Sequence, residues 1–338
     1  MFKFSLILLA SLCISGSAVA KELSELFEVK ISSDQYTNTN DGLNKAFNRL
    51  ILKLSGSRDP KLLWKIGNTK LKKIDYVSSY SIIQEDGLQQ LVVRFNDETL
   101  IPALMEINLP LIGYNRPVIL LLINLDAGES EPIYLAFVKN DQQLEEDLRA
   151  ELRSISLERG VHLELPELDL IDKNLLSKPN VLFSPSQFIQ NKFYNDSFIP
   201  LKISRVGINQ WSIDGFFKSP APMRENEIAD FLAENLQRFL DKLLEVEPLA
   251  IGASGDRLIL SVKGLGSFDD FKKTEEELGR IFAIKSKTYR FFDKTSIDFD
   301  LHLFYSASSL LKELRGSSSF IIKNYDAPNS TLYLELIN

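Results

Sequence analysis

The decisive stretch of the sequence is VILLLINL, residues 118–125. Eight almost uninterrupted apolar residues predict a strand that is buried on both faces, as in a parallel sheet covered by helices. A buried helix is the alternative, but the run is short for a helix and the loop DAGESEP, residues 126–132, follows it. We therefore predict a central α/β module over residues 116–246. Its other predicted elements are helices at 141–159, 185–194 and 224–245 and strands at 161–165, 198–205 and 210–217.

The segments on either side have a different order of elements. Residues 21–115 predict strand, helix, two strands and a helix, with Asp86-Gly87 as the turn of a hairpin. Residues 247–338 predict βαββαβ, the ferredoxin-like order. We therefore expect a fold of mixed α+β and α/β class, in which two ferredoxin-like modules of the βαββαβ type flank the central α/β module. The predicted flanking elements are strands at 27–31, 76–83, 88–95, 257–264, 285–292, 296–305, 319–325 and 331–336 and helices at 43–54, 97–107, 267–279 and 306–314.

The first twenty residues, MFKFSLILLASLCISGSAVA, have the features of a secretory signal peptide. Lys3 precedes a short apolar run, and the small residues Ala18 and Ala20 precede Lys21. The run is too short for a comfortable membrane span. We expect cleavage between Ala20 and Lys21 and export to the periplasm or beyond, by a Gram-negative type of pathway.

Charge and cysteine content narrow the classes of function. Cys13 is the only cysteine and lies in the predicted signal peptide, so the mature chain is expected to contain none. This excludes disulfides, thiol nucleophiles and cysteine-based zinc sites from the expected mature protein. The formal net charge is −7 and becomes −8 without Lys3, since 46 acidic residues then remain against 38 basic ones. An acidic chain with scattered basic residues disfavours a nucleic-acid or anionic-membrane surface.

Motifs for catalysis are scarce. The chain has only two histidines and no Gly-x-Ser-x-Gly sequence, which disfavours a Ser-His-Asp triad. Asp298, Asp300 and His302 share one face of a predicted strand, but alternate residues lie too far apart to bind one small ion easily. The stretch 264–270 lacks the third glycine of a dinucleotide loop, and Ser267 is predicted to cap a helix there. We predict no metal, no cofactor and a non-enzymatic protein.

One acidic stretch could form a ligand-binding site. In VHLELPELDLID, residues 161–172, Pro166 ends a short strand, and a helical turn after it places Asp169 and Asp172 on one face. Such a pair can act as acid and base or bind a divalent cation. The competing interpretation, which we favour, is that the two carboxylates cap a helix or accept loop amides. The candidate ligand-binding residues are Arg116, Asp169, Asp172 and Arg205.

Several short motifs, taken in order, resemble one family. The chain resembles exported bacterial proteins that carry domain of unknown function 2066, and its middle part looks like small α/β modules of periplasmic and outer-membrane assembly factors. The resemblance implies an exported, multi-domain α/β protein and no reaction. The family often has Asp where Asn96 ends one strand here. The matching motifs are Leu54-Ser55-Gly56, Val93-Arg94-Phe95, Arg116-Pro117, Arg159-Gly160 followed by Pro166, Asp169 and Asp172, and Trp211-Ser212-Ile213.

These observations favour an exported periplasmic protein that acts as a non-enzymatic binding or envelope-assembly module. It would engage an envelope protein through its sheet edges and module junctions. The alternative is a ligand-binding or divalent-metal-binding, hydrolase-like protein centred on Asp169 and Asp172. We expect no nucleic-acid partner and no transmembrane span after removal of the signal, and the sequence assigns no oligomeric state.

Overall fold

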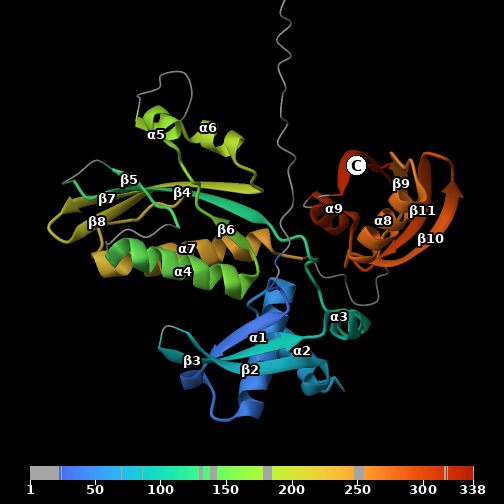
Figure 1. Cartoon of the computed structure of the whole chain (residues 1–338), viewed down its shortest axis with the longest axis horizontal. Coiled ribbons are helices and arrows are strands. Elements are labelled where there is room, and N and C mark those ends of the chain that lie inside the picture. Colours follow the sequence, from blue (N-terminus) through green and yellow to red (C-terminus); the bar gives the residue numbers. More distant parts are fainter. Residues whose placement is uncertain are drawn as a thin grey trace, which may run out of the picture.

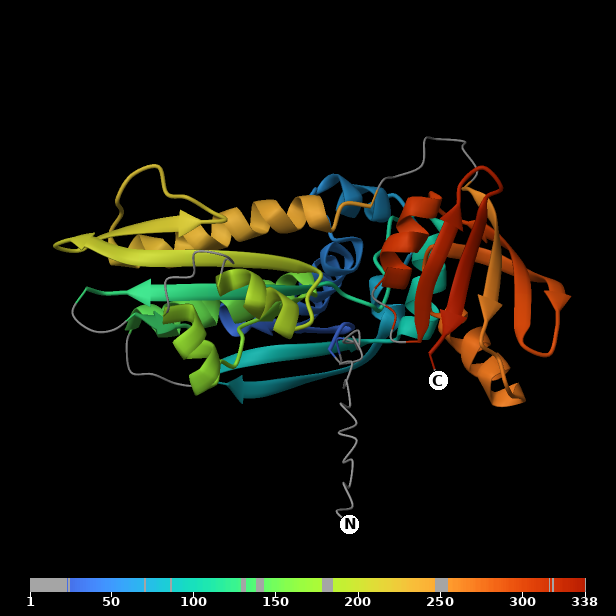
Figure 2. The same ribbon diagram turned by 90° about the horizontal axis from the view of Figure 1, so that it is seen from above.

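The structure is a computed structural model, and it describes most of the chain after the predicted signal peptide. The predicted cleavage site, Cys13 and most of the predicted break at 247–256 lie outside the described residues. Figures 1 and 2 show three modules, with the central module and the C-terminal module at the two ends and the N-terminal module beside both. The described residues are 23, 25–69, 71–85, 87–128, 132–137, 143–177, 185–246, 255–315, 317 and 319–337.

The N-terminal module is a three-stranded antiparallel sheet with the order β1-β3-β2. Its long helix, α1, has apolar residues at helical spacing, and these pack against the sheet in a core with Phe47 at its centre. Asn38 caps this helix by accepting a hydrogen bond from the amide of Asp41, and Gly56 ends it in the left-handed conformation. The elements are β1 (Glu28–Ser32), α1 (Thr39–Ser55), α2 (Lys61–Gly67), β2 (Val77–Glu85), β3 (Leu88–Phe95) and α3 (Asp97–Glu106), with short 3-10 turns at Ser33–Gln35 and Lys73–Tyr76.

The central module confirms the strand predicted at 118–125. Strand β4 is buried on both faces and pairs in parallel with β6 and β7. Ile119 and Leu121 belong to the core under α4 and α7, whereas Leu120 and Leu122 contact the layer of α5 and α6 on the opposite face (Figure 1). The elements are β4 (Val118–Asp126), β5 (Ile133–Tyr134), α4 (Gln143–Arg159), β6 (His162–Glu164), α5 (Leu170–Ser177), α6 (Pro185–Lys192), β7 (Ser197–Gly207), β8 (Gln210–Gly215) and α7 (Ile228–Leu243), with a 3-10 turn at Glu225–Glu227.

The C-terminal module is a five-stranded sheet with the order β10-β11-β9-β13-β12. Ser267 caps α8 as predicted, since its hydroxyl accepts a hydrogen bond from the amide of Asp270. Strand β11 alternates buried apolar and partly exposed polar residues, so Asp298, Asp300 and His302 lie on the more open face. The elements are β9 (Arg257–Lys263), α8 (Phe268–Gly279), β10 (Ile284–Phe292), β11 (Ser296–Leu303), α9 (Ala307–Arg315), β12 (Phe320–Asp326) and β13 (Thr331–Leu336).

The described residues therefore form a mixed α+β protein with three sheets and nine α-helices. The ferredoxin-like arrangement of the flanking modules is not confirmed. The described part of the N-terminal module contributes three strands to its sheet rather than four. In the C-terminal module, β13 lies between β9 and β12 and runs parallel to β9, because a hairpin at 327–330 returns the chain to the middle of the sheet. A strand order of this kind depends on pairing across the chain, which residue periodicity does not specify.

Candidate functional site

Asp169 and Asp172 hold the start of α5, as the favoured interpretation predicts. The Oδ1 atom of Asp169 accepts a hydrogen bond from the Asp172 amide at 2.8 Å, and Oδ2 of Asp172 accepts one from the Asp169 amide at 3.0 Å. Lys192 of α6 donates to both oxygens of Asp172 at 2.7 Å and to Asp169 at 3.3 Å. Hydrogen bonding to the Asp172 amide, together with Lys192, lowers the pKa of Asp169. The pair thus joins α5 to α6.

The structure does not bring the four candidate ligand residues together. Arg116 precedes β4 and is buried, whereas Arg205 is exposed near the end of β7. The parallel register pairs Ile119 with Ser197 and Asp126 with Ser204, so the two arginines lie at opposite ends of the sheet. Neither arginine contributes to the hydrogen bonds described above for Asp169 and Asp172. The basic side chain that binds this carboxylate pair is Lys192, which the sequence analysis did not select.

A different polar cluster emerges at the junction of the three modules, around the carboxyl end of α1. The Nη1 atom of Arg116 donates to the carbonyl of Lys53 at 3.2 Å, and its Nη2 donates to Ile112 at 3.1 Å. The amide of Ile112 donates to the carbonyl of Leu54 at 2.8 Å. Arg116 and Ile112 belong to residues 107–117, which we call the linker, between α3 and β4. Their bonds to Lys53 and Leu54 satisfy carbonyls that the end of a helix leaves without intrahelical partners. The linker is therefore fixed to the N-terminal module by main-chain contacts.

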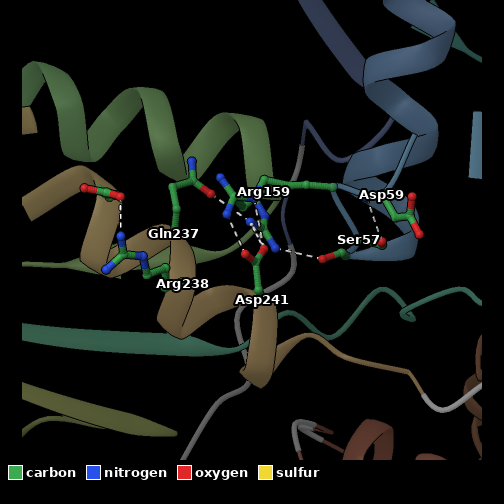
Figure 3. Close-up of polar contacts among 9 residues, drawn as sticks. Ser57, Asp59, Arg159, Gln237, Arg238 and Asp241 are labelled. Atoms are coloured by element: carbon green, nitrogen blue, oxygen red, sulfur yellow. Dashed lines mark hydrogen bonds and ion pairs between the residues drawn. The ribbon is translucent and has the colours of Figure 1, made fainter. Parts of the chain in front are cut away.

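Arg159, the last residue of α4, makes the second connection to α1 (Figure 3). Its Nη2 donates to the carbonyl of Gly56 at 2.7 Å, and its Nη1 donates to Gln237 at 2.7 Å and to Asp241 at 2.8 Å. Arg58 makes a bidentate contact with the same Asp241, at 3.0 and 2.5 Å. The carboxylate of Asp241 on α7 thus binds two arginines, Arg58 of the N-terminal module and Arg159 of the central module. Although burial acts to raise the pKa of Asp241, the hydrogen bonds from Arg58 and Arg159 keep it below its ordinary value.

A buried glutamate makes the corresponding connection to the C-terminal module. Glu313 of α9 accepts hydrogen bonds from the amides of Phe282 and Ala283, both at 2.9 Å, and its side chain lies against Gly113 of the linker. Burial raises the pKa of Glu313 to about 8, while these amide donors and Arg116 act in the opposite direction. Tyr305 of the same module donates to the carbonyl of Leu109 at 2.5 Å. The amide bonds of Glu313 lie within the C-terminal module, and the contacts of that module with the linker are those of Glu313 with Gly113 and of Tyr305 with Leu109.

A cavity of about 290 Å³ lies at this junction. Its lining combines Arg116 and Leu111 of the linker, Leu244 at the end of α7, and Lys312 and Glu313 of α9. Burial lowers the pKa of Arg116 to about 9, and its Nε atom is buried without a hydrogen-bond partner among the described residues. The ionisable groups that line the cavity bind backbone atoms: Arg116 and Lys312 donate to carbonyls of neighbouring modules, and Glu313 accepts from amides of its own module. This arrangement does not resemble a set of acid, base and nucleophile.

The second distinctive region is an apolar groove on the C-terminal module. Phe271 of α8 stacks on Phe268 and Tyr289 at centroid distances of 5.8 and 6.1 Å and meets Phe292 edge-on at 5.8 Å. Phe268 is 76% exposed and Phe292 is 61% exposed. The groove has a volume of about 430 Å³. Exposed aromatic clusters of this kind mark interaction surfaces, because water solvates them poorly. We name these four residues the aromatic groove.

Sequence reasoning missed the aromatic groove, and of the junction cluster it selected Arg116 alone. The aromatic groove had one signal: Phe291 and Phe292 are adjacent on β10, and neighbouring residues of a strand face opposite sides, so both cannot enter one core. The junction had a weaker signal in the sequence. Arg159 stands in the last turn of a helix, where a basic residue is ordinary, and nothing local indicates that it reaches Gly56.

The fold and the junction define a three-module α+β protein, and family comparison adds one finding. A family model described as a domain of unknown function (DUF8605) matches residues 20–113, which correspond to the N-terminal module and its preceding segment. The resemblance to domain of unknown function 2066 is therefore wrong, because the motifs that suggested it are individually too short to identify a family. No curated protein and no solved structure matches the chain.

Two further observations concern metals and membranes. Among the described residues, no group of three or more His, Cys, Asp or Glu side chains is placed to hold a metal ion. None of the helices in the described ranges is long and apolar enough to cross a membrane.

Proposed function

We propose that the protein is an exported, non-enzymatic scaffold of the bacterial envelope that binds a protein partner through the aromatic groove. The signal-like first twenty residues support export. The polar junction supports a scaffold, since buried hydrogen bonds from Arg159 to Gly56 and from Tyr305 to Leu109 connect the modules. The proposal of partner binding rests on one observation, the aromatic groove, which leaves large aromatic side chains in solvent next to a well-packed core.

The geometry of the groove favours insertion of side chains over addition of a strand. Strand β10 is the edge of its sheet, but its pairing with β11 is interrupted at Ile284/Ser286 and again at Tyr289/Phe291. Such bulges distort an edge and hinder continuous pairing with another strand. A volume of about 430 Å³ is enough for one or two large apolar side chains. The partner would therefore contribute an aromatic or aliphatic anchor.

The charge around the groove suggests what flanks that anchor. On one side of the groove, the strand β10 and the turn after it carry four basic residues and one acidic residue, and two of the basic ones, Lys287 and Arg290, form ion pairs with Glu275 and Asp300. The start of α8, on the other side, carries Asp269 and Asp270, so the attraction for an acidic partner is confined to the β10 side. Carboxylates beside the anchor would be attracted to this rim, although salt screens exposed charges. The partner we propose is a protein segment with a large apolar anchor flanked by acidic residues. The basic residues are Lys285, Lys287, Arg290 and Lys294, and the acidic one is Asp293.

We also infer that both flanking modules are variants of the βαββαβ plan. In the C-terminal module, β9, β10 and β11 with α8 keep the first half of that order, and α9 follows β11 as the plan requires. The additional strand β13 beside β9 is the departure.

Site-specific crosslinking in intact cells tests the proposed function. A photoreactive p-benzoylphenylalanine replaces Phe292 in one variant and Ile208 in a control, since Ile208 is an exposed apolar residue on the β7–β8 turn. We expect one protein adduct from position 292 and none from position 208, and Arg290→Glu should reduce the adduct at position 292 at least threefold. Equal adducts at the two positions, or none at either, would contradict binding through the groove.

A further inference from the structure

The β2 strand of the N-terminal module is an edge strand that is exposed over almost its whole length. Among the described strands it pairs only with β3, and residues 78–85 are all exposed. From Ser79 to Ile82 its sequence alternates polar and apolar residues, which ordinarily predicts one buried face. Tyr80 and Ile82, which would form that face, are 55% and 59% exposed. A strand with one unpaired edge and uncovered apolar residues is a candidate for pairing with another chain.

The pairing register explains why these two residues are uncovered. Tyr80 lies opposite Val93 and Ile82 lies opposite Leu91, so all four side chains belong to one face of the sheet. Val93 and Leu91 are buried in the core with α1, but the equivalent face of β2 extends beyond it. The core of the module thus covers β1 and β3 but reaches β2 only at Val77.

This edge lacks the protection that β10 has. After an irregularity between Val77 and Ser79, the pairing of β2 with β3 is regular from Ser79 to Glu85. Residues 77–84 contain no charged residue and no proline. Lysines, prolines and bulges are the features that keep sheet edges from associating. Their absence from this stretch leaves a strand with regular geometry and an open hydrogen-bonding edge.

We propose that two copies of this chain associate through β2, antiparallel about a twofold axis at Ser81. This register places Tyr80 of each copy opposite Ile82 of the other on the uncovered face, an aromatic and β-branched pair that stabilises antiparallel strands. The two three-stranded sheets become one continuous sheet of six strands, and the edge groups of both β2 strands gain partners. The association is isologous, because the same surface meets itself.

Charge favours a second copy at β2 and disfavours it at β10. In the proposed register Glu85 lies opposite Val77, so no like charges meet, and Glu85 is already paired with Lys30 at 3.0 Å. Self-pairing of β10 would bring its lysines and its arginine against those of its copy. A single strand pair buries less area than a typical permanent interface, so we expect a dimer that depends on concentration.

Cysteine crosslinking tests the register in the full chain. With Cys13→Ser the chain has no cysteine, so Ser81→Cys introduces one thiol per copy. The twofold axis places the two introduced thiols opposite each other, within the distance of a disulfide. Ser79→Cys is the matched control, because it is the same exposed residue type on the same face of the same strand. In the proposed register position 79 faces Ile83, and the two copies of position 79 lie roughly 13 Å apart.

Mild oxidation of intact cells should convert most of the Ser81→Cys chain to a disulfide dimer and at least fivefold less of the Ser79→Cys chain. Equal crosslinking at both positions, or none at position 81, overturns the register. An adduct of Ser81→Cys with another protein in place of the dimer overturns self-association in favour of strand addition by that protein.

Sedimentation of the purified chain provides a second measurement. Ile82→Lys changes an exposed side chain and should leave the unfolding midpoint within a few degrees, while weakening dimerisation at least tenfold. Dimerisation that is unchanged by Ile82→Lys would also overturn the proposal. The aromatic groove lies on another module, so failure of this proposal leaves the proposed function untouched.

Discussion

Arg159 and Gly56 are 103 residues apart, and the guanidinium of the first donates a 2.7 Å hydrogen bond to the carbonyl of the second. The contact joins the last residue of α4 to the residue that ends α1. Because α4 belongs to the central module and α1 to the N-terminal one, this bond and the shared carboxylate of Asp241 determine how the two modules meet.

The first prediction concerns Arg159. Arg159→Ala removes the partner of Gly56 and leaves Asp241 with one arginine, and buried groups that lose charged partners are costly. We expect the free energy of unfolding, measured with urea, to fall by about 2–4 kcal/mol. Arg238→Ala is the control, since Arg238 forms an exposed ion pair with Glu234 on α7. It should change the same quantity by less than about 0.5 kcal/mol. Similar losses in both variants would contradict the role given to Arg159.

The second prediction concerns Gly56, which has a φ of 67° and lies against Leu244 of α7. A Cβ atom there would lie 2.7 Å from the Cβ of Leu244, so Gly56→Ala introduces both backbone strain and overlap. Gly87 has a φ of 78° but nothing within 4 Å of an added Cβ. Gly87→Ala should therefore cost about 1 kcal/mol, and Gly56→Ala at least about 2 kcal/mol more. Equal unfolding free energies for the two variants would show that Leu244 does not restrict the site.

Most elements of the fold could be predicted because their residues repeat at the period of a strand or helix. Strand β3 and strand β13 have the predicted bounds, and β4 has one additional residue. The helix α2 was missed because KLLWKIG is short and follows Pro60 in a polar loop. The stretch after Pro166 was predicted to form one turn and instead continues as α5 to Ser177, because Asp169 and Asp172 satisfy its first amides.

The candidate site was less predictable, since its residues are ordinary in their local context. Asp169 and Asp172 could be paired from their spacing of three, which a helical turn places together. The contact of Lys192 with these two carboxylates could not be predicted, because Lys192 lies on a separate helix. Arg159, Arg58 and Asp241 meet only when two modules dock. The exposure of Tyr80 and Ile82 also depends on where the core stops, which alternation along one strand does not reveal.

The third prediction concerns pH. Glu313 has its folded pKa raised to about 8, above its ordinary value of 4.5, so the folded state binds more protons than the unfolded state between these values. The stability associated with Glu313 is full below about pH 4.5 and is lost as the pH rises towards 8. Glu313→Gln removes this titration. We expect the advantage of the native chain over Glu313→Gln to shrink by roughly 2–4 kcal/mol from pH 5 to pH 8, in urea unfolding at each pH. An advantage that stays constant or grows with pH would contradict the prediction.

The fourth prediction concerns the carboxylate pair on α5. Asp172 is buried and holds Lys192, so Asp172→Asn should weaken the contact between α5 and α6 and lower the unfolding free energy by about 1–3 kcal/mol. Millimolar Mg²⁺ or Ca²⁺ should leave the Tm of the native chain unchanged, because the Lys192 ammonium already binds both carboxylates and offsets one of their two charges. A rise in Tm with either ion that disappears in Asp172→Asn would instead establish a metal site.

The central claim is that the junction holds the three modules as one scaffold, and distances between modules test it most directly. In the Cys13→Ser background, spin labels at Gln89→Cys and Ile208→Cys report on the N-terminal and central modules, and labels at Gln89→Cys and Ser286→Cys report on the two flanking modules. Dilution with unlabelled chain removes distances between copies. We predict one narrow distance distribution for each pair in the native sequence and a broader one for the first pair with Arg159→Ala. Broad distributions for both pairs in the native sequence would contradict a scaffold held by its junction.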